Sequence, residues 1–228
     1  MVFVIEAVLF DFGRVVSAPK PPSLFARYER ELGLRPGTLN TVMFDSPHWR
    51  DALLGRKTMK EFWYAVGPEL GLRTSRAVDD FRSRYYADER INDEVVEVVR
   101  RLHGRVKLAI LSNSPPGLKD WLAEWGLLHY FDTVFCSGDE GVVKPDPRAY
   151  CIVLERLGAG PRQAVFIDDA RENVEAAESL GIRGILYDKP GALMGVDSLV
   201  LRGLPNQFAV LKISRTPSRT FSPGCCRQ

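Results

Sequence analysis

Five short apolar segments, separated by stretches with helical periodicity, are the feature that most restricts the fold of this chain. They lack the apolar–polar alternation of a half-exposed strand, so both of their faces should be buried. In chain order they read VFVIEAVLF, VKLAILS, DTVFCS, AVFID and RGILY. Strands that alternate with helices at this spacing are joined by right-handed crossovers. The pattern therefore predicts an α/β fold, a doubly wound parallel sheet with helices on both faces.

One long stretch, residues 17–91, interrupts this alternation with helical patterns and no convincing strand. We therefore expect a small helical domain inserted into the α/β core, which would comprise residues 1–16 and 92–213. The remaining residues, 214–228, are polar, basic and rich in serine and proline, and such a composition predicts a disordered tail.

Several helices carry recognisable start signals. Thr58 followed by Glu61 has the spacing of a capping box. Asn92 stands where it could cap the next helix, and Asp146 precedes Pro147 at the start of another. In the helix near residues 117–125, Trp121 and Trp125 are four residues apart, which predicts that both pack against the sheet.

The overall composition excludes several classes of protein. The 228 residues include 31 basic and 29 acidic side chains, a net charge of +2 that indicates no nucleic-acid partner. We find no apolar stretch of membrane-spanning length, and the four cysteines form neither a disulfide framework nor a zinc pattern. We expect a cytoplasmic protein with no membrane association, either a monomer or a homodimer.

Polar side chains follow the predicted strands at the sheet edge where ligands bind in such folds. The edge collects three carboxylates, a lysine, a hydroxyl and an amide, which belong to Asp11, Ser112, Asn113, Lys144, Asp168 and Asp169. Carboxylates are hard ligands suited to Mg²⁺, and a lysine and a hydroxyl can hold phosphate oxygens. Taken singly, each residue is as easily a helix cap, a loop residue or a surface charge. The adjacent pair Asp168–Asp169 is the most informative, because two neighbouring carboxylates after a buried strand repel each other unless a cation compensates.

Four segments in this order, LFDFGRVV, ILSNS, VVKPDPRAY and FIDDARENVEAAESLGI, resemble the four motifs of the haloacid dehalogenase-like hydrolase superfamily, and its phosphatases in particular. The resemblance runs from about residue 4 to residue 187. It is strongest to the subgroup whose first motif reads Asp-x-Gly-x-Val. It implies a Rossmann-like core, a helical cap inserted after the first motif, and Mg²⁺ as cofactor.

The resemblance also implies roles around the metal. Asp11 would be the nucleophile and a magnesium ligand, and the carbonyl of Gly13 a second ligand. Asp169 aligns with a direct ligand, and Asp168 with the residue that acts through water. Asn173 would support either the lysine or the acidic loop, or is simply a polar residue on the helix surface.

A second set of residues would hold the phosphate. It comprises the Phe12–Gly13 turn with Ser112, Asn113 and Lys144, and Lys144 would also pair with the nucleophile. Candidates for choosing the substrate are Arg14 and the cap residues His48, Trp49 and Arg50. Arg14 points either at substrate or at solvent. It is equally consistent with the sequence that Trp49 packs in the hydrophobic core of the cap and that Arg50 is a charge exposed to solvent.

Gly13 stands where the Asp-x-Asp phosphatases of this superfamily carry their general acid and base. Neither glycine nor the following Arg14 can exchange that proton. Glycine can also be read as the residue that permits a tight turn around the phosphate. The missing carboxylate predicts an enzyme that is slower or restricted to good leaving groups.

We therefore expect a Mg²⁺-dependent phosphatase that hydrolyses the phosphate monoester of a small metabolite, such as a sugar phosphate, through an aspartyl-phosphate. Two alternatives remain open. One is a family member without catalysis that binds a ligand or a partner, which Gly13 favours. The other is a 2-haloacid dehalogenase, against which the pair Asp168–Asp169 argues because that reaction needs no metal.

Overall fold

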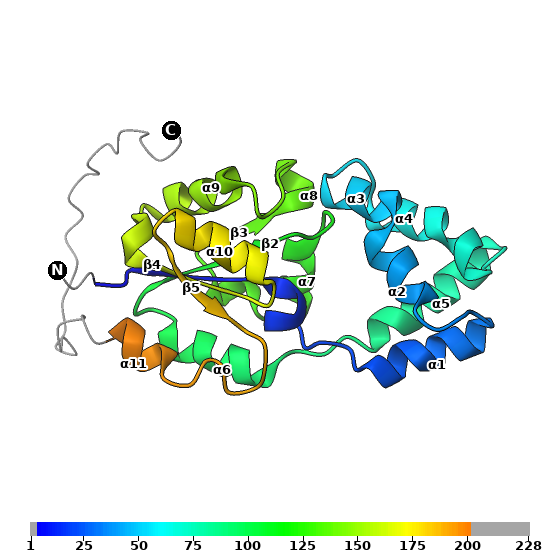
Figure 1. Ribbon diagram of the computed structural model, residues 1–228, viewed down its shortest axis with the longest axis horizontal. Helices are drawn as coiled ribbons and strands as arrows, with labels where there is room; N and C mark the ends of the chain where they lie inside the picture. The colour runs from blue at the N-terminus through cyan, green and yellow to red at the C-terminus, as the bar shows by residue number, and fades with distance from the viewer. Residues whose placement is uncertain (1–3, 202–228) are drawn as a thin grey trace.

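A five-stranded parallel sheet forms the centre of the computed structural model, which describes residues 4–201 (Figure 1). The strands are β1 (Ala7–Phe10), β2 (Lys107–Ser112), β3 (Thr133–Cys136), β4 (Ala164–Asp168) and β5 (Arg183–Leu186). Their order is β3-β2-β1-β4-β5, and all neighbours are parallel. The predicted α/β fold is confirmed. The predicted tail, 214–228, and the last part of the predicted core, 202–213, lie outside the described residues.

Successive side chains of the central strand enter different hydrophobic cores. Val8 and Phe10 of β1 pack in the core that includes α6 (Asp93–Leu102), α7 (Leu118–Glu124) and α11 (Val196–Leu201). Ala7 and Leu9 pack in the core that includes α9 (Pro147–Leu157) and α10 (Arg171–Ser179). Both faces are thus covered, which explains why the strands are continuous apolar runs. Figure 1 shows α9 and α10 above the sheet and α6 and α11 below it.

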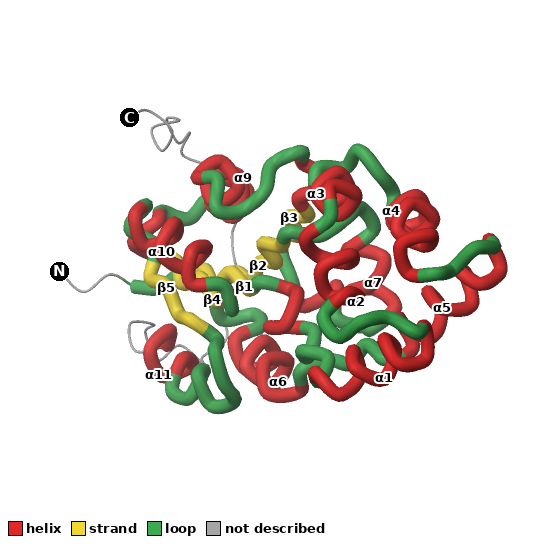
Figure 2. The backbone as a smooth tube through the Cα atoms, turned by 45° about the vertical axis from the view of Figure 1, so that its right-hand side comes forward, coloured by secondary structure: helices red, strands yellow, loops and turns green. Residues whose placement is uncertain are grey.

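The insert between β1 and α6 is helical, as predicted (Figures 1 and 2). Its helices are α1 (Pro22–Leu32), α2 (Thr38–Asn40), α3 (Pro47–Leu53), α4 (Met59–Val66) and α5 (Ser75–Ala87). They enclose a hydrophobic core of their own, in which Trp63 is fully buried and packs edge to face with Phe81 and Tyr85. A separate core lets these helices keep their shape independently of the sheet.

All three helices begin where predicted, and two of the three expected capping bonds are formed. Thr58 and Glu61 form the capping box, and the Asp146 carboxylate accepts a hydrogen bond of 2.9 Å from the backbone N–H of Arg148. Asn92 stands at the N-cap of α6, but the expected capping bond is absent. Its side chain donates instead to the hydroxyl of Tyr187, at 2.9 Å.

The insert contacts the sheet part of the molecule at its base, at its far side, and through Tyr86 of α5, whose ring packs edge to face on Trp121 of α7. At its base the two connecting segments run side by side, paired at Ser17 and Ile91. At its far side the loop after α3 approaches α8 (Ser137–Glu140) so closely that a Cβ on Gly55 would lie 2.1 Å from the carbonyl oxygen of Gly138. Gly55 also has a φ of +72°, a conformation that favours glycine. These contacts fix the insert above the loops that follow β1 and β2.

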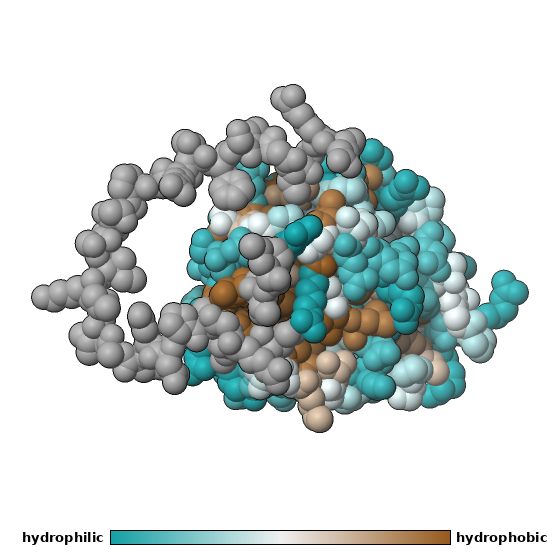
Figure 3. All heavy atoms as spheres, turned by 60° about the vertical axis from the view of Figure 1, so that its left-hand side comes forward, coloured by the Kyte–Doolittle hydropathy of each residue, from teal (hydrophilic) through white to brown (hydrophobic). Residues whose placement is uncertain are grey.

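The outer surface is mixed. On the face seen in Figure 3, hydrophilic side chains make up much of the described surface, with apolar ones among them. Within residues 4–201, no helix has the length and apolar character needed to cross a membrane.

Candidate active site at the carboxyl edge of the sheet

β2 and β3 lie on one side of β1, and β4 and β5 lie on the other, so the strand order changes direction at β1. Ligands of doubly wound folds bind at such a switch point. Phe10 of β1 is in register with Ile167 of β4, so the residues that follow them stand side by side. These residues are Asp11 and Asp168, and the backbone N–H of Asp11 donates to the carbonyl of Ile167 at 2.8 Å. The sheet register therefore brings together two carboxylates that are far apart in sequence.

Lys144 connects these two carboxylates. Its Nζ lies 2.7 Å from Asp11 Oδ1 and 2.6 Å from Asp168 Oδ2, and its side chain is 1% exposed. A buried ammonium with two carboxylate partners is fixed in position by charge-assisted hydrogen bonds. The predicted pairing of Lys144 with the nucleophile candidate is present in the structure.

The pKa values of Asp11 and Lys144 are both raised, but for different physical reasons. Burial raises the pKa of Asp11 from 3.8 to about 6, against the opposing attraction of Lys144 and with a further contribution from the charge of Asp168. For Lys144, burial disfavours the charged form, but Asp11 and Asp168 outweigh it and raise the pKa of the ammonium. Above pH 6 the site therefore holds an ionised Asp11 beside a charged lysine.

Asp168 and Asp169 are adjacent but have different surroundings. Asp168 accepts hydrogen bonds from Lys144, from the backbone N–H of Ala170 at 2.7 Å, and from Asn173 Nδ2 at 3.1 and 3.2 Å. Asn173 thus contacts the acidic loop, which is one of the three alternatives that the sequence left open for this residue. The carboxylate of Asp169 is 18% exposed and has an ion pair of 3.1 Å with Arg14. Burial raises the pKa of Asp169, although Arg14 opposes the shift.

The three carboxylates form a group that can hold a metal ion. One oxygen each of Asp11, Asp168 and Asp169 lies within 4.8 Å of the other two. Both oxygens of Asp168 already accept hydrogen bonds, whereas Asp169 is held by an arginine whose side chain is 73% exposed. This donor set fits a hard divalent cation such as Mg²⁺, with Asp11 and Asp169 better placed than Asp168 for direct contact.

The predicted phosphate-binding residues stand beside this group. Ser112 is buried at the end of β2, and Asn113 follows it. The amide of Asn113 donates to the Lys144 carbonyl at 2.9 Å and accepts from the Lys144 N–H at 2.7 Å, so it also holds the Lys144 backbone in place. The ring of Phe12 is buried and packs against Trp121 and Trp125.

The turn after Asp11 does not depend on glycine, contrary to the tight-turn reading. Gly13 has a φ of −66°, and a Cβ added there would have Asp11 Oδ2, at 3.9 Å, as its nearest contact. The left-handed residue of the turn is Arg14, with a φ of 62°. The Arg14 side chain is 73% exposed and pairs with Asp169, so it is largely in solvent, and its contact with substrate stays a prediction. A Cβ at position 13 would meet no clash, and the backbone there suits residues other than glycine.

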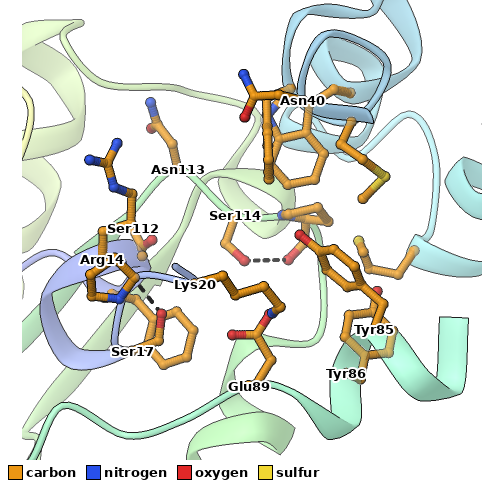
Figure 4. Close-up of a pocket in the computed structure, with 18 of the residues that line it drawn as sticks. Arg14, Ser17, Lys20, Asn40, Tyr85, Tyr86, Glu89, Ser112, Asn113 and Ser114 are labelled. Atoms are coloured by element: carbon orange, nitrogen blue, oxygen red, sulfur yellow. Dashed lines mark hydrogen bonds and ion pairs between the residues drawn. The ribbon is translucent and has the colours of Figure 1, made fainter. Parts of the chain in front are cut away.

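A cavity of about 880 Å³ extends from this edge beneath the insert (Figure 4). Gly13, Arg14, Ser112 and Asn113 line its catalytic end. Of the cap residues predicted to choose the substrate, Trp49 lines the cavity and also packs on Phe62 of the insert's core. His48 and Arg50, the neighbours of Trp49 on α3, are not among the residues that line it.

The chain matches the family model of the haloacid dehalogenase-like hydrolases over residues 5–181. The chain belongs to this family. The expected enzyme class, a hydrolase with phosphatase relatives, is thereby confirmed. It is 28% identical to a sesquiterpene phosphatase from Aspergillus oryzae, over 86% of this chain and 96% of that protein. It is also 28% identical to a phosphoserine phosphatase from Thermus thermophilus, over 81% of this chain and 70% of that protein.

Solved structures of haloacid dehalogenase-like enzymes share the fold. One from Bacteroides thetaiotaomicron, determined with magnesium and inorganic phosphate, is 19% identical and superimposes with a TM-score of 0.64, covering 83% of this chain and 98% of that one. At this identity the likeness concerns the fold alone.

Some cavity residues were not foreseen from the sequence. Lys20 and Glu89 form an ion pair in the cavity wall, although 69 residues separate them. Trp121, predicted only to pack against the sheet, lies in the same wall and contacts Tyr86 edge to face, with ring centroids 5.0 Å apart. The ion pair of Lys20 and Glu89 leaves no local pattern in the sequence, because its members are so far apart. The amphipathic pattern of a helix predicts that Trp121 is buried, but it does not predict which residues Trp121 contacts.

Proposed function

We propose that this haloacid dehalogenase-like hydrolase is a Mg²⁺-dependent phosphatase that transfers the phosphoryl group of a small phosphate monoester to Asp11. The observation that carries the proposal is the buried contact of Lys144 with both Asp11 and Asp168, at 2.7 and 2.6 Å. A lysine held in this way can neutralise a phosphate oxygen next to the carboxylate that attacks. The cytoplasmic location predicted from the sequence is retained as part of the proposal.

The proposed reaction has two steps. An oxygen of Asp11 forms a bond to phosphorus while the ester bond to the leaving alkoxide breaks, and the alkoxide takes up a proton from water. Water then attacks phosphorus, the bond to Asp11 breaks, and inorganic phosphate leaves. The first step needs ionised Asp11, and a Mg²⁺ ion in contact with this carboxylate would favour the ionised form.

Mg²⁺ would be held by Asp11 and Asp169 directly, by Asp168 through water, and by the carbonyl of Gly13. When bound, it supplies positive charge that offsets the charge of the phosphate and of the clustered carboxylates. Ser112, Asn113 and the backbone of the Phe12–Gly13 turn would contact the remaining phosphate oxygens. Asn173 would keep Asp168 in place through its two hydrogen bonds.

The test is phosphate release from a panel of monoesters, with Mg²⁺ and with a chelator, for the wild type and for Asp11→Asn. The control is Asp80→Asn, which changes a carboxylate that is 71% exposed on α5. We expect Mg²⁺-dependent release that is lost in Asp11→Asn and kept in Asp80→Asn. Direct titration with Mg²⁺ gives a reading that does not depend on turnover.

Other results would favour the alternatives. Mg²⁺ binding without release from any ester would support a binding protein without catalysis. Halide release from 2-haloacids that persists in chelator would support a dehalogenase. Release that survives in Asp11→Asn would contradict the proposed nucleophile.

A further inference from the structure

The cavity beneath the insert extends well beyond the space that a phosphate group needs. Its volume is about 880 Å³, and its walls come from the loops after β1 and β2 and from the insert (Figure 4). A phosphate at the carboxylate end would fill a small part of it. The remainder is therefore available to the alcohol part of an ester, and its chemistry should match that alcohol.

Away from the catalytic end, the wall consists mainly of apolar and aromatic side chains. They include Phe25, Met43, Phe44, Trp49, Met59 and Trp121. Several are held by aromatic contacts, such as Phe44 against Trp49, edge to face with centroids 5.6 Å apart. Phe44 is nevertheless 38% exposed, one of three large hydrophobic side chains in the described part of the chain that stay so exposed. Because Phe44 continues the apolar lining of the cavity, the wall as a whole is suited to an apolar ligand.

The charged residues of the wall are already paired. Lys20 pairs with Glu89, and its ammonium also lies 4.2 Å from the centre of the Tyr85 ring. Glu29 accepts a hydrogen bond of 2.9 Å from the backbone N–H of Leu39. The fourth charged residue of the lining, Arg14, belongs to the catalytic end.

The hydroxyls of the wall are partly engaged as well. Tyr86 accepts a hydrogen bond of 2.7 Å from Trp63, and Ser114 donates one of 3.2 Å to the carbonyl of Pro115. A sugar in this cavity would exchange many hydrogen bonds with water for few with the protein. An apolar group would lose little on entering and would gain from burial.

We infer that the substrate is the phosphate monoester of an apolar alcohol, such as a prenyl, alkyl or aryl phosphate, with its apolar part lodged between Phe44, Trp49 and Trp121. This inference rests on the proposed phosphatase function. It replaces the sugar phosphate expected from the sequence with the phosphate ester of an apolar alcohol. The phosphate stands at Asp11, and the apolar part runs along the wall toward the exposed ring of Phe44.

The first experiment measures kcat/KM for butyl, hexyl, octyl and decyl phosphate beside glucose 1-phosphate and phosphoserine. Burial of each added methylene should raise kcat/KM by about fourfold until the cavity is full. The free alcohol, octanol, should inhibit competitively. A flat response to chain length, or a preference for glucose 1-phosphate, would overturn the inference while leaving a phosphatase in place.

Two variants locate the effect. Phe44→Ser removes an apolar contact at the cavity and should lower kcat/KM for octyl phosphate several-fold, with little effect on butyl phosphate. Val4→Ser is the matched control, because Val4 is 37% exposed and precedes β1 at the opposite edge of the sheet. Equal losses in both variants, or a loss that does not depend on chain length, would contradict the proposed placement.

Binding without turnover separates this inference from the proposed function. Calorimetry with Asp11→Asn should show octyl phosphate binding more tightly than glucose 1-phosphate in the presence of Mg²⁺. If no ester is hydrolysed by the wild type but this order of affinities holds, the phosphatase proposal fails and the apolar ligand stands. If the order is reversed, the inference fails whatever the turnover.

Discussion

Substituting Gly13 by aspartate tests whether the missing carboxylate limits the reaction. The structure leaves room for the Cβ of the new side chain, which would lie 3.9 Å from Asp11 Oδ2, and the backbone φ of −66° suits any residue. The substitution places an ionisable group next to the proposed nucleophile without changing the turn. Gly13→Asn is the matched control, because asparagine has the same shape and cannot exchange a proton.

The expected size of the effect follows from the position of the new carboxylate. Two like charges about 4 Å apart repel by ~4 kcal/mol at an effective dielectric constant of about 20. Repulsion from Asp11, Asp168 and Asp169 therefore raises the pKa of the new group and keeps part of it protonated near neutral pH. A protonated carboxyl at this place can donate to the leaving oxygen, and such help is typically worth about 10²–10⁴ in rate.

The assay compares kcat for phenyl phosphate and p-nitrophenyl phosphate, which are similar in size but differ in leaving group. Gly13→Asp should raise kcat by about 10² or more for phenyl phosphate, whose phenolate needs a proton, and much less for p-nitrophenyl phosphate. Gly13→Asn should give no such gain. In chelator the repulsion should also lower the melting temperature of Gly13→Asp, and Mg²⁺ should restore it.

Two results would refute this reasoning. Equal rates for the Asp and Asn variants would show that the proton comes from elsewhere. An equal gain on both esters would show that the substitution acts on binding or on the metal, because leaving-group protonation must distinguish the two.

Two further predictions concern the position of the insert and the stability of the fold. Gly55→Ala should lower kcat/KM by up to about 10²-fold, because the contact with the Gly138 carbonyl must open by roughly an ångström. The control is Gly33→Ala, which has a similar φ of +67° and nothing within 4 Å, and which should lose stability but keep its activity. Equal activities in the two variants would contradict the role of the Gly55–Gly138 contact. Asp146→Ala should lower the free energy of unfolding by about 1 kcal/mol at pH 7, through loss of the helix cap. Because the hydrogen bonds from Arg148 lower the pKa of Asp146 in the folded state, this contribution is present above its unfolded pKa of about 3.9 and is lost as the pH falls below that value. Denaturant unfolding at pH 7 and pH 3 measures the difference between wild type and variant, which should shrink at the lower pH.

The sequence by itself determined the sheet and the gathering of its polar residues. Short continuous apolar runs that alternate with helical patterns indicate strands buried on both faces, and parallel strands place their carboxyl ends at one edge. Asp11, Lys144 and Asp168 could therefore be assigned to one site although 157 residues separate the first from the last. The capping signals at Thr58 and Asp146 were equally readable, because they depend on residues two or three positions away.

Only the tertiary structure decided what surrounds that site. Asn92 is a residue type that commonly caps helices, yet its side chain donates a hydrogen bond to the hydroxyl of Tyr187, which is distant in sequence. Lys20 and Glu89 pair across the cavity wall, and Trp121 faces the insert as well as the sheet. Local periodicity records that a side chain is buried, but the partner depends on how distant segments pack. The character of the cavity, and with it the inferred substrate, arises from that packing.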